Sequence, residues 1–316
     1  MSDKVCLLVS DDLARYGFPS DHPFGTDRQG AFLGKARSRG FDTKVKVLAS
    51  REATRAELER FHTVDHVNRV IVKSQQGVGY LDYGDTPAFV GVFEISSHVV
   101  GAAVVALDAV MAGTCKRSFQ PIGGLHHARR DRAAGFCVFN DIGVVIETLR
   151  GRYGVKRIAY VDIDVHHGDG LYYPYESDPD LIIADIHEDG DYLYPGTGHS
   201  WETGKDAASG TKLNISMPPG AGDAEFRRQW EHVEAHLVKF RPEFFLLQCG
   251  ADSLSGDPIA HLRYTAAAHG HAAKRLCVLA DEYAGGRLMV FGGGGYNRSN
   301  LALAWNAVLE ALIDAP

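Results

Sequence analysis

Short apolar runs recur along this chain and are separated by longer segments of helical periodicity. The runs have the length and flanking turn residues of buried strands, which predicts strands at 5–9, 41–48, 157–161, 181–186, 212–217, 243–249 and 287–291. Apolar positions spaced three and four residues apart predict helices at 54–73, 90–111, 142–153, 223–240, 264–283 and 301–313. Strands that alternate with helices indicate an α/β fold with a central, mostly parallel sheet and helices on both faces. Because no linker, repeat or low-complexity tract divides the sequence, we expect a single domain spanning residues 1–316.

Two polar segments lie among the predicted elements. Residues 11–30 are rich in Gly, Pro, Asp and His and are expected to form an irregular loop. The predicted helix at 54–73 carries His62, Asp65 and His66 at a spacing that would suit a ligand. A histidine pair on a helix is more often a solvated or capping feature, and we adopt that interpretation.

The most polar segment of the chain continues one of its buried strands. It reads Y-V-D-I-D-V-H-H-G-D-G from Tyr160 to Gly170. Alternate side chains of a strand share a face, so Asp162, Asp164 and His166 should point the same way. Burying unpaired carboxylates is costly. A divalent metal removes that cost, because carboxylate oxygen and imidazole nitrogen both suit zinc or iron(II).

Several polar residues fall at the carboxyl ends of predicted strands, namely Asp164, His166, Asp252 and Tyr296. In parallel sheets the ligand site lies at this edge, so we expect one active site there. Asp164, His166 and Asp252 would give a metal three ligands and leave coordination open, which is the catalytic arrangement.

Hydrolysis at such a metal also needs a general base, and the sequence offers imidazoles for that task. His126 and His127 are adjacent, while Asp162 and Asp169 remain as free carboxylates beside the ligands. Tyr296 follows a run of four glycines and could donate its hydroxyl to an oxyanion.

The amino-acid composition limits the classes of partner that we expect the chain to bind. The 316 residues are 45% hydrophobic and 23% charged, and the formal net charge of -7 argues against nucleic acid without excluding a cationic substrate. Five scattered cysteines form no C-x-x-C pair, so neither a disulfide scaffold nor a thiolate zinc site is expected. We see no signal-peptide layout and no apolar run near membrane-spanning length, which favours a reducing, cytoplasmic setting.

Six ordered motifs, spread over nearly the whole chain, resemble those of the histone deacetylase family, including its bacterial acetoin-utilisation and acetylpolyamine members. The motifs are P-I-G-G-L-H-H-A, G-F-C-V-F-N-D, V-D-I-D-V-H-H-G-D-G, Y-P-G-T-G, G-A-D-S-L-S-G-D-P and G-G-G-G-Y-N. The resemblance implies an arginase-like α/β fold and zinc-dependent amide hydrolysis. Iron(II) also suits the ligand set, and the family implies a structural potassium site as well.

The resemblance assigns a role to each matching position. The metal ligands would be Asp164, His166 and Asp252. His127 looks like the general base oriented by Asp169, His126 like its partner imidazole paired with Asp162, and Tyr296 like the tyrosine that polarises the carbonyl. Substrate-binding positions fall on Gly135, whose carbonyl would accept the amide N–H, on the tunnel walls Phe136 and Tyr194, and on Ile259 and Gly294.

Three positions depart from the family pattern. Tyr194 stands where phenylalanine is frequent, which makes one tunnel wall more polar. Asp185 replaces a serine beside the potassium site and makes that ion less secure. Ile259 replaces a leucine or methionine near the tunnel floor, where it would change acyl preference. With no basic C-terminal segment, a free-standing bacterial-type enzyme fits best.

The favoured function is hydrolysis of an acyl group from a lysine side chain in a peptide or protein. One alternative is an acetylated small amine as substrate, for which Asp82 and Asp85 would receive ammonium groups. A ureohydrolase would need a second metal site, and a silent acyl-lysine binding protein would not need His126, His127 and Tyr296. The sequence leaves the oligomeric state open, a homo-oligomer included, and predicts no membrane partner.

Overall fold

The chain folds around one eight-stranded sheet in which every neighbouring pair of strands is parallel. This computed structural model describes residues 4–19 and 22–316. The spatial order is β2-β1-β3-β8-β7-β4-β5-β6. The strands are β1 (Val5–Leu8), β2 (Lys46–Leu48), β3 (Arg117–Gln120), β4 (Ile158–Asp162), β5 (Leu181–Glu188), β6 (Lys212–Met217), β7 (Phe244–Gln248) and β8 (Leu288–Phe291). The predicted parallel α/β fold is therefore confirmed.

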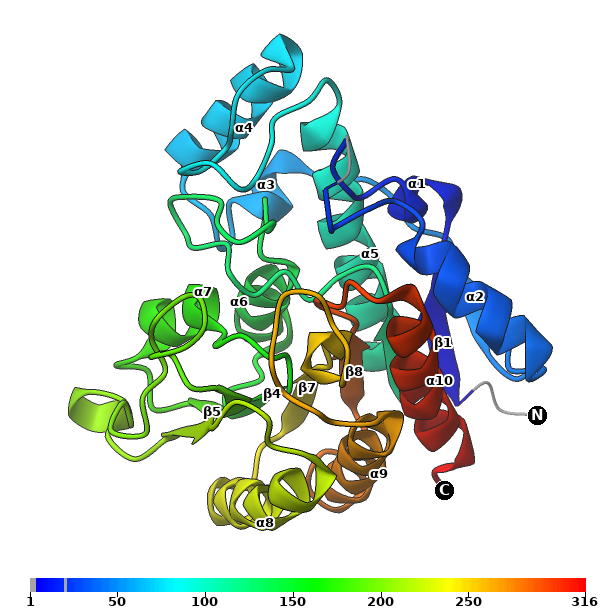
Figure 1. The fold of residues 1–316 in the computed structure, drawn as a ribbon, viewed down its shortest axis with the longest axis vertical. Coiled ribbons are helices and arrows are strands. Elements are labelled where there is room, and N and C mark those ends of the chain that lie inside the picture. The colour runs from blue at the N-terminus through cyan, green and yellow to red at the C-terminus, as the bar shows by residue number, and fades with distance from the viewer. Residues whose placement is uncertain (1–3, 20–21) are drawn as a thin grey trace.

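Helices cover both faces of the sheet (Figure 1). Helices α2, α8, α9 and α10 pack on one face, and α5 and α6 pack on the other. The helices are α1 (Asp11–Ala14), α2 (Arg28–Ser38), α3 (Arg55–Leu58), α4 (Val64–Gln76), α5 (Val92–Met111), α6 (Asp141–Tyr153), α7 (Asp169–Tyr172), α8 (Asp223–Phe240), α9 (Ala266–Tyr283) and α10 (Arg298–Asp314). Burial on both faces explains why most strands are continuous apolar runs.

The N-terminal third contains most of the wrong predictions. The predicted loop at 11–30 includes α1 and the start of α2, and its residues 20–21 lie outside the described part of the chain. The single helix predicted at 54–73 is two helices, because Thr63 caps a new one and accepts a hydrogen bond from the His66 amide. Of the predicted strand at 41–48 only β2 forms.

Helix α5 corrects the expectation that no apolar run approaches membrane-spanning length. An 18-residue window in it has a mean hydropathy of 1.5, so by length and composition this helix could cross a membrane. However, 67% of that window is buried inside the protein. The helix packs against β1, β3 and β8, and its apolar character is explained by its place in the core.

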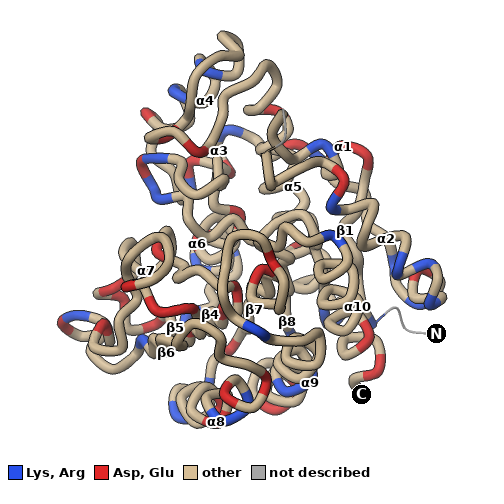
Figure 2. Tube along the Cα trace, in the orientation of Figure 1, with Lys and Arg blue, Asp and Glu red and all other residues tan. Residues whose placement is uncertain are grey.

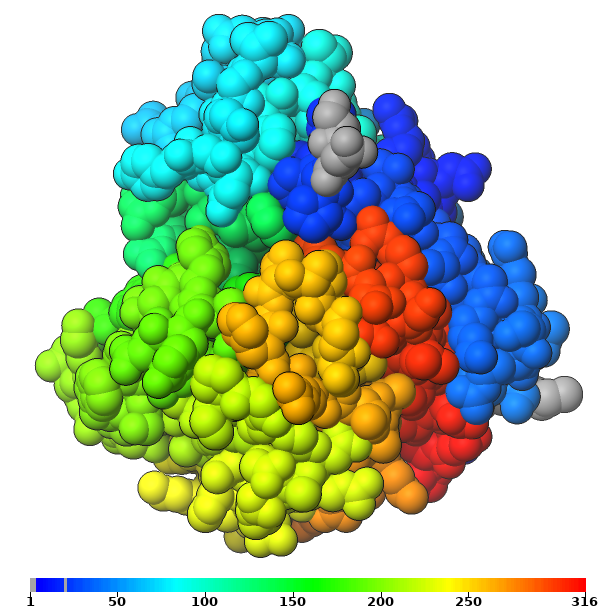
Figure 3. Space-filling view, viewed as in Figure 1, coloured from blue at the N-terminus to red at the C-terminus, as the bar shows by residue number. Residues whose placement is uncertain are grey.

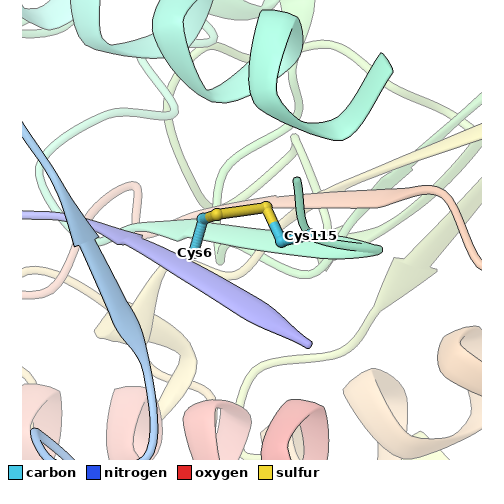
Figure 4. The surroundings of a disulfide bond; sticks show 2 residues. All are labelled: Cys6 and Cys115. Carbon is cyan, nitrogen blue, oxygen red and sulfur yellow. A yellow bond between two sulfur atoms is a disulfide. The ribbon is translucent and has the colours of Figure 1, made fainter. Parts of the chain in front are cut away.

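Contrary to the expectation from cysteine spacing, Cys6 and Cys115 form a disulfide (Figure 4). Strands β1 and β3 are neighbours, with Val5 opposite Arg117, and this pairing brings the two cysteines to a Cα–Cα distance of 5.9 Å. Spacing in the sequence could not show this, because the two cysteines are 109 positions apart. The cysteine count therefore no longer supports a reducing compartment.

The four central strands position the candidate site. Strands β3, β8, β7 and β4 are consecutive in the sheet, and each is followed at its carboxyl end by one of the polar motifs. Loops from distant parts of the chain meet over this region. In Figure 3 they include the green segment near residue 190, the gold segment near residue 260 and the blue segment near residue 25.

Candidate metal-dependent active site

The three predicted ligands converge. Asp164, His166 and Asp252 are all buried, and their ligand atoms lie within 4.8 Å of one another. His166 Nδ1 is 3.0 Å from Asp164 Oδ1 and 3.3 Å from Asp252 Oδ2. Figure 2 shows acidic segments at the centre of the molecule beside β7 and β8, as well as on its periphery.

The strand argument for these ligands was only partly right. Strand β4 ends at Asp162, so Asp164 and His166 lie on an irregular segment beyond it. The alternation persists because each side chain binds the backbone two residues on. Asp162 Oδ1 accepts from the Asp164 amide and Asp164 Oδ1 accepts from the His166 amide, both at 3.0 Å.

The donor set fits a divalent metal. Asp252 Oδ1 accepts a hydrogen bond from the Val165 amide, whereas within residues 4–19 and 22–316 the buried Asp252 Oδ2 has no donor other than His166 Nδ1, 3.3 Å away. A buried carboxylate oxygen that faces only another candidate ligand is costly unless a cation meets it. Although burial opposes it, hydrogen bonds to Asp164 and Asp252 raise the pKa of His166 to about 10. Burial and the charge of Asp164 raise the pKa of Asp252 to about 7, so placing two carboxylates together here carries a cost that a bound cation would remove.

Two imidazoles face each other beside the ligands. His126 Nδ1 lies 2.7 Å from Asp162 Oδ2, and His127 Nδ1 lies 2.7 Å from Asp169 Oδ1. Each Nδ1 therefore carries a proton toward a carboxylate. The two Nε2 atoms are 3.1 Å apart, which leaves one proton shared between them.

The environment gives the two histidines different basicity. Burial would lower the pKa of His126, but the charges of Asp162 and Asp164 outweigh it and raise that pKa to about 9. Burial and the charge of His126 lower the pKa of His127 to about 4, although Asp169 opposes this. Two titratable groups whose pKa values are shifted in opposite directions suit separate acid and base roles. In this arrangement His127 is the neutral imidazole.

Residues that the sequence analysis missed hold the histidine segment. Asp141 accepts hydrogen bonds from the amides of Gly124 and Leu125, both at 2.9 Å. Asn140 caps α6 and donates from its side chain to the Ala128 carbonyl at 2.9 Å. Asn140 and Asp141, which end the motif G-F-C-V-F-N-D, therefore hold the backbone on both sides of His126 and His127 by hydrogen bonds. Nothing in the spacing of these motifs showed that they would bond each other.

The glycine run presents Tyr296 at the site. The Tyr296 amide donates to Asp257 Oδ2 at 2.8 Å, and the Tyr296 ring packs against Phe136 with centroids 5.9 Å apart. Burial, followed by the negative charges of Asp252 and Asp164, holds the pKa of Tyr296 well above its ordinary value. The hydroxyl therefore stays protonated and can donate. The run needs glycine, because a Cβ on Gly294 would lie 1.9 Å from Asp252 Oδ2.

Aromatic side chains flank the approach to the ligands. Tyr194 lies over the site with its ring centroid 5.0 Å from that of His127. Gly135 and Phe136 both have positive φ, and a Cβ on Gly135 would lie 2.6 Å from the His127 ring. Ile259 is half-buried on the segment after Asp257 and does not line the cavity at the ligands.

The interpretation of His62 and His66 as solvated or capping side chains was wrong. Both are buried, and they lie behind the segment that carries Phe136. His62 Nε2 accepts from the Asn140 amide at 2.8 Å, and His66 Nε2 lies 2.9 Å from the Val138 carbonyl oxygen. The centroids of the two rings lie 5.0 Å apart although His62 precedes α4 and is not helical, and the sequence pattern did not show that both side chains are directed into the protein.

Asp185 is satisfied within the protein. Its carboxylate lies 2.6 Å from His187 Nδ1 and accepts from the Gly168 amide at 2.9 Å. Another group, formed by Asp189, Asp191 and His199, brings three ligand atoms together at the surface. Within the described residues, the buried set of three is the one beside the histidine pair.

Comparisons with known proteins agree with these motifs. A family model described as the histone deacetylase domain matches residues 22–312. Among curated relatives, the acetoin utilization protein AcuC of Staphylococcus aureus is 32% identical over 324 residues, covering 100% of this chain and 83% of the relative. AcuC of Bacillus subtilis is 33% identical, covering 94% and 78%. A solved structure entitled HDA15 HD domain superposes with a TM-score of 0.90 at 27% identity, covering 99% of this chain and 89% of the other.

Proposed function

The chain belongs to the histone deacetylase family, and we propose that it is a zinc-dependent deacetylase that removes acetyl or other acyl groups from the side-chain amine of lysine in peptides and proteins. The proposal rests above all on the convergence of Asp164, His166 and Asp252 beside the facing histidines. Bound there, zinc would polarise the amide carbonyl and lower the pKa of water to about 7. Iron(II) suits the same ligands.

The histidine pair supports the proton transfers that amide hydrolysis needs. We assign His127 as general base, because it is neutral at pH 7 and its Nδ1 is held by Asp169. Its Nε2 would accept the proton of the attacking water and return it to the leaving amine nitrogen. His126, protonated beside Asp162, would keep a positive charge next to the forming oxyanion.

The oxyanion and the substrate stem have their own partners in this proposal. The Tyr296 hydroxyl would donate to the oxyanion, with Gly294 leaving the space that the acyl group needs. Phe136 and Tyr194 would hold the methylene stem between them, and the Gly135 carbonyl would accept the amide N–H. The potassium site that the family resemblance implies stays a prediction, since Asp185 already bonds His187 and Gly168.

The carboxylates at the rim favour acyl-lysine over an acetylated polyamine. Asp82 Oδ1 accepts three amides of its own loop, from Gly84, Asp85 and Thr86 at 3.0, 3.1 and 2.9 Å. The carboxylate of Asp82 therefore already serves as the hydrogen-bond acceptor of its own loop. Burial and the neighbouring Asp82 raise the pKa of Asp85 to about 7, so Asp85 carries only part of a charge at neutral pH. Asp82 and Asp85 would therefore bind the ammonium group of a polyamine only weakly.

Metal analysis tests the core of the proposal. The purified protein should hold about one zinc or iron per chain and release acetate from an acetyl-lysine peptide. Asp252→Ala should lose metal and activity together, because it removes the buried oxygen that faces His166 Nδ1 and has no backbone donor. Full metal occupancy in Asp252→Ala would refute the ligand assignment. Two metals per chain would favour a ureohydrolase, and peptide binding without acetate release would favour a binding protein.

The substrate class needs a separate measurement. We expect kcat/KM to be higher for an acetyl-lysine peptide than for N-acetylputrescine. Asp82→Asn and Asp85→Asn probe the rim, and neither should change the ratio between the two substrates greatly. A clear preference for the polyamine that either variant abolishes would make this an acetylpolyamine deacetylase.

A further inference from the structure

Gln248, the last residue of β7, lies directly beneath the candidate metal site and is fully buried. Its Nε2 donates to Asp164 Oδ2 at 2.8 Å, and its Oε1 accepts from the Gly250 amide at 2.7 Å. The Gly250 amide can only donate, so the side-chain oxygen must face it. The side-chain nitrogen is therefore turned toward Asp164, and the orientation of the amide is fixed.

This contact helps to determine which oxygen of Asp164 faces the other ligands. Oδ2 receives Gln248 Nε2 and, at 2.9 Å, the Gly294 amide. Oδ1 accepts from the His166 amide and lies on the side where His166 Nδ1 is 3.0 Å away and Asp252 completes the set. Without the two donors on Oδ2, only the His166 amide would restrain the carboxylate, which could then rotate more freely. The sheet itself supports the contact, since Gln248 pairs with Asp162 in β4 and its carbonyl accepts from Ile163 at 3.0 Å.

Packing leaves Gln248 little freedom to move. A Cβ on Gly293 would lie 2.3 Å from its Nε2, and one on Gly124 would lie 3.1 Å from its Cγ. Gly124 precedes the histidine pair and Gly293 precedes Tyr296, so both segments press on the same side chain. An amide also carries no charge. It orients the carboxylate without cancelling the negative charge that attracts a divalent ion, as a lysine or arginine would.

We propose that Gln248 is a positioning residue that presents Asp164 to the metal, an inference that rests on the metal dependence proposed above. Partners that orient a metal ligand are typically worth about 10- to 100-fold in metal affinity. The loss should appear in binding of the ion itself, before any substrate is present. At saturating zinc the KM for peptide should stay near that of the wild type, because Gln248 does not line the cavity.

The experiment measures zinc affinity of the metal-free full-length protein by competition with a chelating dye. Gln248→Met keeps the length of the side chain and removes the donor, so zinc should bind about 10- to 100-fold more weakly. Gln120→Met is the matched control. Gln120 is also a buried glutamine at the end of a strand, but its Nε2 donates to the carbonyls of Val99 and Ile122 at 2.9 and 2.8 Å. The zinc affinity of the Gln120→Met variant should equal that of the wild type.

A second variant tests the same contact in case Gln248→Met folds poorly. Gln248→Asn keeps a buried amide but is one methylene too short to reach Asp164, and it should show the same loss. Wild-type zinc affinity in both Gln248 variants, or an equal loss in Gln120→Met, would overturn the inference while leaving the metal site intact. A wild-type protein that binds no zinc or iron would instead refute the proposed function, and this inference with it.

Discussion

Buried histidines behind the segment that carries Phe136 should make the protein sensitive to acid. His66 lies on α4 and is fully buried, with Nε2 2.9 Å from the Val138 carbonyl oxygen, so its Nε2 carries a proton. Its other nitrogen, Nδ1, has no hydrogen-bond partner in the described structure. Burial is the main reason that the pKa of His66 falls to about 4; the nearby Arg69 adds to the effect, and Asp131 opposes it.

The sign and size of the effect follow from this pKa. In the unfolded chain the pKa of histidine is about 6.5, so between pH 6.5 and 4 the unfolded state binds more protons than the folded state. Stability therefore falls as the pH falls. For one group with these two pKa values, the free energy of unfolding drops by about 2 kcal/mol between pH 7 and pH 5.

Replacing His66 with glutamine isolates this contribution. Gln keeps an N–H that can reach the Val138 carbonyl but does not titrate, so His66→Gln should lose about 2 kcal/mol less than the wild type on going from pH 7 to pH 5. Urea unfolding of both proteins at each pH measures the difference. His232→Gln, at an exposed position on α8, should behave as the wild type. If the wild-type and His66→Gln stabilities fall in parallel, His66 does not enter the folded state neutral and the reasoning is wrong.

Two further predictions concern Tyr296, the oxyanion donor that we propose, and the disulfide. Tyr296→Phe should cut kcat by about 100- to 1000-fold with little change in KM or zinc content, and activity near that of the wild type would show that the glycine run only shapes the cavity. Reducing the bond between Cys6 and Cys115 should lower the free energy of unfolding by about 2–4 kcal/mol, seen as a lower Tm in reductant. The Cys6→Ser variant should have this lower Tm without reductant, and reductant should not change it further. A wild-type Tm that does not change in reductant would contradict the prediction.

The elements that the sequence predicted correctly are those whose buried residues are mainly apolar. Strand β3 was missed because its residues read R-S-F-Q, yet all four are buried. The Arg117 guanidinium is held by Asp281 at 2.7 Å and the Gln120 amide by backbone carbonyls, which no hydrophobic pattern can reveal. Helix α2 was missed for the same reason, since half of its buried residues, Arg28 and Gln29, are polar. Periodicity detects burial only where burial is apolar.

The aspartates of the site show why ligands and supporting residues could not be separated by residue type alone. Asp141 uses both carboxylate oxygens to hold the backbone before His126, and Asp257 accepts the amides of Ile259 and Tyr296. Asp252 differs in one respect, since its Oδ1 accepts the Val165 amide, whereas in the described structure its buried Oδ2 has no backbone donor and faces His166 Nδ1 at 3.3 Å. That difference depends on which backbone N–H groups the fold brings near each carboxylate. Asp252 becomes a candidate ligand because the surrounding backbone leaves one of its oxygens open. Asp164 accepts a backbone amide on each oxygen, and it is a candidate because Oδ1 lies 3.0 Å from His166 Nδ1. Both features are properties of adjacent strand ends rather than of any single motif.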